Sequence, residues 1–173
     1  TVAAVLKDCD IPAHVESNTG YFSSYEIQVI LSMLRILDNP LQDIPMAAVL
    51  ASPIVGMDDE ELAQIRSAFK GVSFAQAALS AMAGEDGYED EKLKAFALVF
   101  ERLRGAVADT PIHELLYMML DETGFYRYAS AMPAGKRRRQ NIDMLIEMAA
   151  AYEKTSYKGL FHFVRYIDIQ QKY

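Results

Sequence analysis

The sequence has one cysteine, Cys9, and no tryptophan among its 173 residues. A single cysteine excludes an internal disulfide framework and suits a reducing compartment. No apolar run reaches the roughly 18 residues that a membrane-spanning helix needs, and no signal peptide is recognisable at the start. We therefore expect a cytoplasmic protein without membrane contact, in which Cys9 is a small, partly buried residue of the first helix.

Sequence motifs for stand-alone catalysis are also missing. There is no Gly-x-x-x-x-Gly-Lys-Ser/Thr phosphate loop and no Gly-x-Ser-x-Gly nucleophile elbow. One cysteine and three widely spaced histidines cannot supply a zinc site, and the carboxylates form no convincing acid/base pair. We expect His14, His113 and His162 to be structural or surface residues. The chain alone is expected to hold no catalytic residue, metal or cofactor.

The charge of the chain is unevenly distributed. An apolar content of 51% is ample for a core, so this length indicates one domain, or one domain plus a fragment of another. Residues 1–135 contain nine Lys/Arg and twenty Asp/Glu, whereas residues 136–173 contain eight and four. The overall acidity argues against nonspecific binding to a polyanion, but the basic end leaves room for a small phosphate-contacting patch.

Apolar residues recur at helical spacing along most of the chain. We expect a predominantly all-α, irregular helical subdomain of about seven to nine helices, with one short strand near the N-terminus. The candidate helices are Val2–Lys7, Ser23–Leu37, Met46–Ala51, 59–69, Phe74–Met82, Asp90–Arg104, 112–123, 136–154 and Leu160–Gln170, with a further turn or two expected at Phe125–Ala131.

The segment around residues 11–43 has two unusual features. A strand-like stretch, Pro12–Glu16, is followed by an expected turn at Asn18–Gly20 and no second convincing strand, although a lone strand is not independently stable. The helix Ser23–Leu37 is apolar almost all round, which is typical of a helix buried on several sides. Both features indicate a missing partner, so we expect exposed apolar surface and possible self-association.

Local patterns assign roles to two further groups of residues. The four carboxylates from Asp58 to Glu61 stand at a helix entry, where capping is favoured over metal binding. Ser73 is a plausible N-cap for the helix that follows it. The methionines within apolar runs, including Met33 and Met119, are interpreted as core filling rather than as a ligand pocket.

One cluster of positive charges lies where the helix dipole disfavours it. Four consecutive cations occupy the first turn of the helix that starts near Gly135, where the positive end of the helix dipole prefers anions. This indicates a phosphate contact, because cations and helix-end amides both attract an anion. The alternative is a solvated basic turn, or pairing with acidic residues elsewhere in the chain. The candidate residues are Lys136, Arg137, Arg138 and Arg139.

Residues Ile11–Asp43 resemble UvrD/Rep-type superfamily 1 DNA helicases, which have an I-P-x-x-V strand, a Gly-x-Phe turn and an E-I-x-x-x-L-x-x-L-x-x-I-x-N-P helix. The matching positions are Ile11, Pro12, Val15, Gly20, Phe22, Glu26, Ile27, Leu31, Leu34, Asn39 and Pro40. The continuation to Gly56 is closer to one branch, the AddA subunits of bacterial AddAB helicase–nucleases, although Ala51 stands where that branch usually has Arg. Later positions resemble the helix before the family's fifth motif: Pro133, Gly135, Arg138, Asn141, Ile142, Leu145, Ala149, Tyr152 and Glu153.

The resemblance implies that residues 1–22 are a stub of motor domain 2A and that residues 23–173 are a helical 2B-like insertion. The parent protein would be an ATP-dependent 3′–5′ DNA helicase/exonuclease of double-strand-break repair and recombination. It would use ATP and Mg²⁺ and pair with a second, AddB-like subunit. This region would be non-catalytic and would contribute duplex-DNA or partner contacts. Two alternatives stay open: a docking or regulatory module that does not touch DNA, and a stand-alone helical binding protein.

Overall fold

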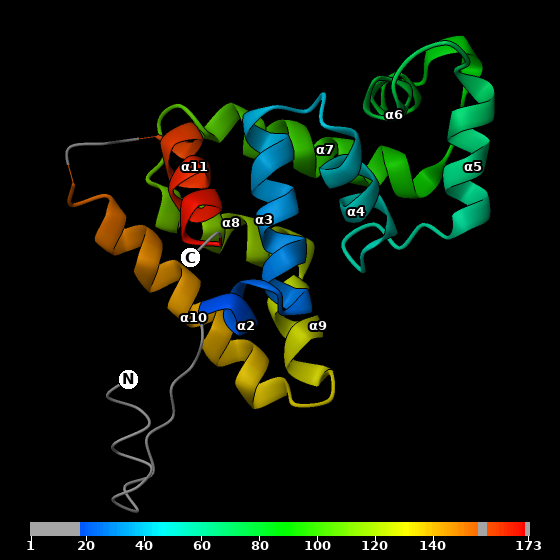
Figure 1. Cartoon of the computed structure of the whole chain (residues 1–173). Coiled ribbons are helices and arrows are strands. Elements are labelled where there is room, and N and C mark those ends of the chain that lie inside the picture. Colours follow the sequence, from blue (N-terminus) through cyan, green and yellow to red (C-terminus); the bar gives the residue numbers. More distant parts are fainter. Residues whose placement is uncertain (1–17, 156–158, 172–173) are drawn as a thin grey trace, which may run out of the picture.

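The computed structural model describes residues 18–155 and 159–171, and over these residues the fold is predominantly all-α, as expected. The described ranges contain ten α-helices, one short 3₁₀ turn (η1, Glu85–Gly87) and no strand (Figure 1). The helices are α2 (Asn18–Phe22), α3 (Tyr25–Asp38), α4 (Asp43–Ala51), α5 (Asp59–Ala68), α6 (Phe74–Met82), α7 (Glu91–Ala106), α8 (Ile112–Thr123), α9 (Phe125–Ala131), α10 (Gly135–Tyr152) and α11 (Leu160–Gln170). The helix expected at Val2–Lys7 and the strand expected at Pro12–Glu16 lie outside the described residues.

The turn expected at Asn18–Gly20 is wrong, because these residues begin helix α2. Burial of the two aromatic residues at the end of α2 explains the difference. Tyr21 and Phe22 are buried in the core with their ring centroids 4.9 Å apart, and the Tyr21 hydroxyl donates to the Asn141 carbonyl at 2.9 Å. Aromatic burial therefore outweighs the turn preference of Asn and Gly.

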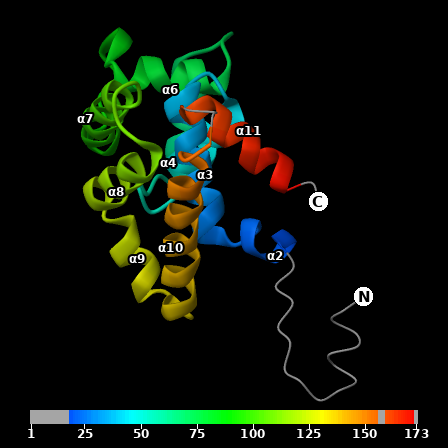
Figure 2. The same ribbon diagram turned by 90° about the vertical axis from the view of Figure 1, so that its left-hand side faces the viewer.

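Helix α3 is the central element of the fold. Ten of its fourteen residues are buried, which confirms that it is apolar almost all round. It packs against α4, α7, α10 and α11, so the chain itself covers it on several sides (Figures 1 and 2). The inference that this helix lacks a partner is therefore wrong, and it no longer supports self-association.

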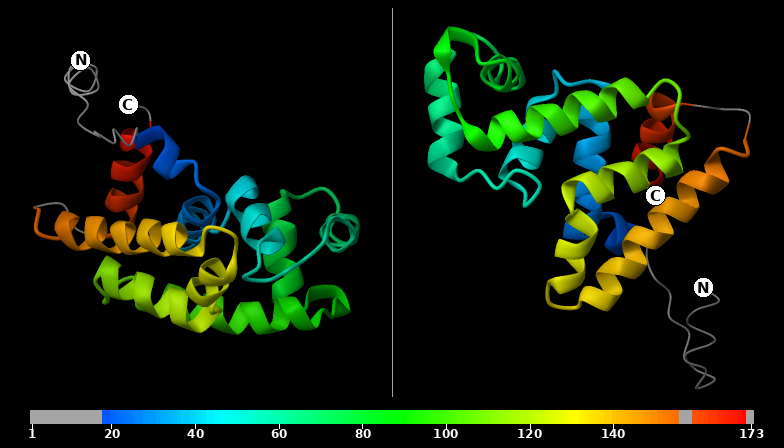
Figure 3. Two further views of the ribbon diagram at one scale, coloured as in Figure 1. Left: turned by 90° about the horizontal axis from the view of Figure 1, so that it is seen from below. Right: turned by 180° about the vertical axis from the view of Figure 1, so that it is seen from behind.

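The other helices form two groups around α3. Helices α4, α5 and α6 contact one another in sequence and lead into α7. Helices α8, α9 and α10 pack together, and α8 also contacts α7. The α5–α6 pair and the turn between α9 and α10 lie at separate extremities of the molecule (Figures 1 and 3). None of the described helices is long and apolar enough to cross a bilayer.

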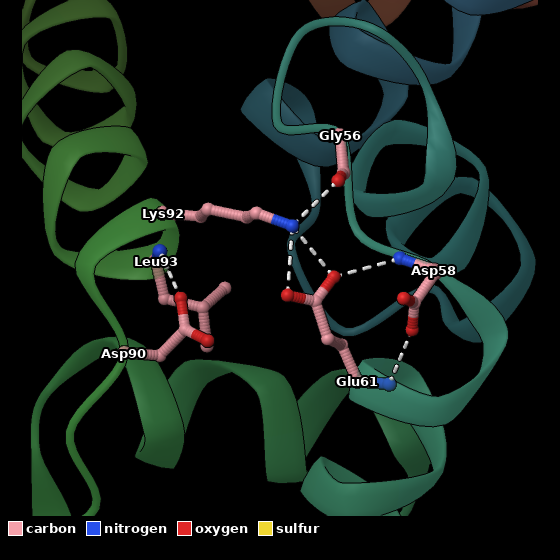
Figure 4. A network of polar contacts seen from close by, with 6 residues as sticks. All are labelled: Gly56, Asp58, Glu61, Asp90, Lys92 and Leu93. Carbon is pink, nitrogen blue, oxygen red and sulfur yellow. Dashed lines mark hydrogen bonds and ion pairs between the residues drawn. The ribbon is translucent and has the colours of Figure 1, made fainter.

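The acidic residues before α5 cap that helix, as the sequence predicts. Asp58 Oδ1 accepts from the Glu61 amide and Glu61 Oε2 accepts from the Asp58 amide, both at 2.8 Å, which completes a capping box (Figure 4). Lys92 Nζ lies 2.7 Å from both Glu61 oxygens and donates to the Gly56 carbonyl at 2.9 Å. The Lys92 hydrogen bond is the largest of the causes that lower the pKa of Glu61. Asp90 caps α7 with a single hydrogen bond, which its Oδ1 accepts from the Leu93 amide at 2.9 Å.

Replacing Asp58 with alanine should lower the melting temperature of the chain by about 2 to 4 °C, because one end of the capping box is lost. Circular dichroism during heating measures this shift. Asp59→Ala is the matched control, since Asp59 also lies in the first turn of α5 but makes no cap hydrogen bond. Equal shifts for the two variants would show that first-turn charge, rather than the cap, stabilises α5.

Several smaller predictions are confirmed as well. Ser73 Oγ accepts from the Gln76 amide at 3.2 Å at the start of α6. Met33 and Met119 are fully buried in the core. His113 is structural, because its Nδ1 hydrogen-bonds a carboxylate oxygen of Glu153 across α8 and α10.

Candidate nucleic-acid interface

The most strongly basic segment of the described chain is a helical hairpin. Residues 124–142 contain five Lys/Arg and no Asp/Glu. They span α9 and the first two turns of α10, two helices that pack against each other. We call residues 124–142 the basic hairpin. Its cations are Arg127, Lys136, Arg137, Arg138 and Arg139.

A tight turn fixes where α10 begins. Ala134 has a left-handed conformation, with φ 59° and ψ 31°, and its carbonyl accepts from the amides of Arg137 and Arg138 at 2.9 and 3.1 Å. The next residue is Gly135, where a Cβ atom would lie 1.9 Å from the carbonyl oxygen of Ser130 in α9. Only glycine allows the two backbones to approach this closely. The turn therefore depends on Gly135 and presents the cations that follow it.

Arg138 points inward rather than to solvent. Its Nη1 lies 2.5 Å from Glu26 Oε2, and its Nε donates to the Pro133 carbonyl at 3.0 Å. The Glu26 side chain is 1% exposed and that of Arg138 is 23% exposed. The structure thus places Arg138 in an internal ion pair, the alternative considered for this cluster. Arg138 is therefore the least exposed of the four residues predicted to contact phosphate.

Glu26 is the buried anion that joins α3 to α10. Asn141 Nδ2 donates to its Oε1 at 2.6 Å, on the side opposite Arg138. Burial opposes ionisation of Glu26, but the hydrogen bonds from Asn141, its own backbone amide and Arg138 outweigh burial and hold its pKa below the usual value. Burial, with a smaller contribution from Glu26, raises the pKa of Tyr21. The carboxylate is therefore ionised and fully paired near neutral pH.

The sequence motifs contain the residues on both sides of this contact but do not indicate that these residues meet. Glu26 matches the helicase pattern of the early helix, and Arg138 and Asn141 match the later one. The structure brings them together across more than 110 residues of sequence. The available signal was a carboxylate in the first turn of a largely apolar helix, because a charge that such a helix buries needs a partner.

The other three cations of the first turns of α10 are exposed. Lys136, Arg137 and Arg139 make no ion pair with any residue that the structure describes. Tyr128 of α9 is 46% exposed on the same hairpin. Exposed cations without ion-pair partners are a feature of surfaces that bind phosphate groups.

The far end of the molecule has the opposite charge. Residues 58–91, from the entry of α5 to the first residue of α7, contain nine Asp/Glu and two Lys/Arg. This acidic end lies away from the α9–α10 turn (Figure 1). Such a polarised charge distribution repels a polyanion at one end and attracts it at the other. The described part of the chain is therefore acidic at the α5–α6 end and basic at the α9–α10 end.

The remaining family-motif positions have structural roles. Phe22 is buried in the core, and Gly20 lies within α2. Asn39 ends α3, where its Oδ1 accepts from the Leu41 amide at 3.1 Å just beside Pro40. Within residues 18–155 and 159–171, no three His, Cys, Asp or Glu side chains come together as a metal ion would require.

Comparison with known proteins identifies relatives of one kind over nearly the whole chain, although no family model matches it. The AddA-type ATP-dependent helicase/nuclease subunit of Anoxybacillus flavithermus is 43% identical over 161 residues, covering 92% of this chain and 13% of the relative. The Bacillus cytotoxicus protein of the same name is 41% identical over 167 residues (94% and 13%). The Enterococcus faecalis protein is 40% identical over 177 residues (99% and 14%).

The chain thus spans about one seventh of the length of these relatives. Identity of this level over so much of the chain reaches well beyond the Ile11–Asp43 motifs. The matched region of the Enterococcus faecalis relative covers 99% of this chain and so extends over both α3 and α10. Over nearly its full length, the chain belongs with a segment of the AddA-type subunits of ATP-dependent helicase/nucleases.

Proposed function

We propose that this chain is a non-catalytic helical region from one subunit of an ATP-dependent DNA helicase/nuclease and that its basic hairpin contacts the phosphates of duplex DNA. The observation that carries the proposal is the trio of exposed, unpaired cations Lys136, Arg137 and Arg139. They follow a tight turn that is held by Gly135 and anchored to the core through Arg138. Exposed cations on a helix start that is fixed to the core favour phosphate contact without sequence readout.

The proposal extends to the rest of the subunit. ATP and Mg²⁺ would bind in motor domains outside this chain, and a second, AddB-like subunit would complete the enzyme in the cytoplasm. The complete enzyme would act as a 3′–5′ helicase and exonuclease in double-strand-break repair and recombination. Residues 1–22 would belong to motor domain 2A and residues 23–173 to a 2B-like insertion. Helix α2, whose Tyr21 and Phe22 pack on the insertion, would lie where the two parts meet.

The test is to replace Lys136, Arg137 and Arg139 together with alanine in the complete subunit. Each lost phosphate contact removes about 0.9 from the slope of log affinity against log salt, so the slope should flatten by about 2.7. Duplex affinity near physiological salt should fall by roughly ten- to a hundredfold. Fluorescence anisotropy of a labelled duplex over a salt series measures both quantities.

The matched control replaces Lys70, Lys94 and Arg104, three exposed cations of the α5–α7 region, with alanine. It changes the net charge by the same amount and should leave the slope within experimental error. An unchanged slope of log affinity against log salt in the hairpin variant would contradict the proposed DNA contact. If the hairpin variant instead lost only assembly with the second subunit, the region would be a docking module that does not touch DNA.

A further inference from the structure

A pocket lies where α8, α9 and α10 meet. These three helices contact one another (Figure 2), and the pocket that they line has a volume of about 390 Å³. This volume is within the range of about 300 to 1,000 Å³ that is usual for ligand pockets. Leu120 and Ile146, which are buried, supply the apolar part of the lining, and the other lining residues are aromatic or charged.

Two tyrosine rings supply the aromatic part of the lining. The Tyr126 hydroxyl donates to Asp143 Oδ1 at 3.1 Å, which ties α9 to α10 beside the pocket. Burial and then this hydrogen bond raise the pKa of Tyr126, so its hydroxyl keeps the donated proton near neutral pH. Tyr117 of α8 is 58% exposed, and its ring is therefore open to stacking by another planar group.

Three charged side chains complete the lining. Asp121, Arg127 and Asp143 make no ion pair with any residue in the described ranges, although they line one pocket. A carboxylate can only accept hydrogen bonds, and a guanidinium can only donate them. The pocket therefore offers two acceptors and one donor to a polar ligand.

The pocket adjoins the cations of the basic hairpin. Arg127 belongs to both, and Asp121 and Asp143 lie just outside the two ends of the hairpin in sequence. Asp143 follows Arg139 by four residues on α10, so their side chains share a face of the helix and lie about 6 Å apart along its axis. The charge of Arg139 also acts on the Tyr126 hydroxyl. A phosphate beside Arg139 would thus bring its nucleotide to the pocket.

The charges around the pocket favour a nucleobase as its occupant. Carboxylates repel phosphates, but in complexes with nucleic acid they accept hydrogen bonds from base amino groups. Bases taken out of the stack are held by such hydrogen bonds and by stacking on aromatic side chains. A cationic side chain of a protein partner would also suit the carboxylates, but Arg127 and Arg139 would repel it.

We propose that this pocket binds an unstacked nucleobase that carries an amino group, from the strand whose phosphates contact the basic hairpin. The base stacks on Tyr117, and its amino group donates to Asp121 or Asp143. Cytosine, adenine and guanine carry such a group, whereas thymine does not. The inference rests on the proposed function, because the hairpin cations hold the strand beside the pocket.

The test measures binding of the complete subunit to three labelled duplexes by fluorescence anisotropy. One duplex carries a single unpaired cytosine, the second an unpaired thymine and the third an abasic position at the same place. The cytosine duplex should bind at least about fivefold more tightly than the abasic one, because one base is stacked. It should also bind more tightly than the thymine duplex, whose base is a pyrimidine without the amino group.

Tyr117→Ala should abolish the preference for cytosine over the abasic position and leave the salt slope on a fully paired duplex unchanged. Replacing Asp121 and Asp143 together with alanine should strengthen binding of all three duplexes, because two negative charges are lost. It should nevertheless remove the preference for cytosine over thymine, which a purely electrostatic or structural role would not alter. Phe161→Ala is the matched control, since Phe161 is 50% exposed on α11 and does not line the pocket.

Equal affinity of the natural subunit for the three duplexes would overturn the inference. A cytosine preference that survives Tyr117→Ala would place the base elsewhere and would overturn it too. If Tyr117→Ala weakened only assembly with the second subunit, the pocket would be a protein-docking site instead. Failure of the phosphate contact is distinguishable, because it appears as an unchanged salt slope when Lys136, Arg137 and Arg139 are replaced, whatever the three duplexes show.

Discussion

Replacing Glu26 with alanine is expected to lower the free energy of unfolding by about 3 kcal/mol, because removing one partner of a buried ion pair leaves the other uncompensated. At this chain length, that loss corresponds to a fall in melting temperature of roughly 6 to 12 °C. Arg138 and the Asn141 amide would both lose their acceptor. Chemical denaturation with urea, followed by circular dichroism, measures the change.

Arg137→Ala is the control for this prediction. Arg137 is next to Arg138 in the sequence but is exposed, so its loss should change stability by no more than about 0.5 kcal/mol. A Glu26→Ala variant as stable as Arg137→Ala would show that the junction between α3 and α10 contributes nothing to the fold.

The pH dependence of stability tests whether the charge of Glu26 is the cause of the stabilisation that Glu26→Ala removes. Its pKa is lower in the folded chain than its ordinary value of 4.5, so the folded state favours the ionised form. The stabilisation is therefore fully present above pH 4.5 and is lost as pH falls through the folded-state pKa. The stability difference between the natural chain and Glu26→Gln should be constant near neutrality and shrink below pH 4.5. A difference that does not depend on pH would assign the effect to packing alone.

Replacing Gly135 with alanine is expected to destabilise the chain by about 3 kcal/mol, at the upper end of the usual cost of overpacking. The new Cβ would lie 1.9 Å from the Ser130 carbonyl oxygen, and backbone atoms cannot move aside as a flexible side chain can. The turn would have to open, which would displace the start of α10 and its cations. Urea denaturation measures the stability, and the salt slope of duplex binding reports the displaced cations.

Ala134→Gly is the control for Gly135→Ala. It removes a Cβ atom one residue earlier instead of adding one. Ala134 already has φ 59°, a left-handed conformation that costs a residue with a Cβ about 1 kcal/mol. Glycine relieves that strain but gains entropy in the unfolded chain, so the net change should be small or stabilising. If Gly135→Ala were tolerated as well as Ala134→Gly, the close approach of α9 and α10 would not be needed for the turn.

Local chemistry was predictable from the sequence wherever a few neighbouring residues decide it. The sequence predicted that carboxylates between Asp58 and Glu61 cap α5 and that Ser73 caps α6, and both caps form between residues three positions apart. The reciprocal capping box of Asp58 and Glu61 was not part of that prediction. The burial of α3 followed from its apolar residues alone. Helix α2 did not follow, because its Tyr21 is held by a hydrogen bond 120 residues away along the chain.

The basic cluster shows that a sequence pattern does not predict contacts between residues far apart in the chain. Four adjacent cations look equivalent in the sequence, yet the packing of α3 against α10 turns Arg138 inward to Glu26 and leaves the others exposed. A periodic pattern gives the face of a residue on its own helix but not the partner helix that this face meets.

The most direct test of the account is hydrogen exchange of the complete subunit with and without duplex DNA. DNA should slow exchange in peptides that cover α9 and the start of α10, while peptides of the acidic α5–α7 end should not change. The contact is electrostatic, so this protection should disappear at high salt. DNA-dependent protection at the acidic end, with none at α9 and α10, would contradict the claim that this helical region holds DNA through its basic hairpin.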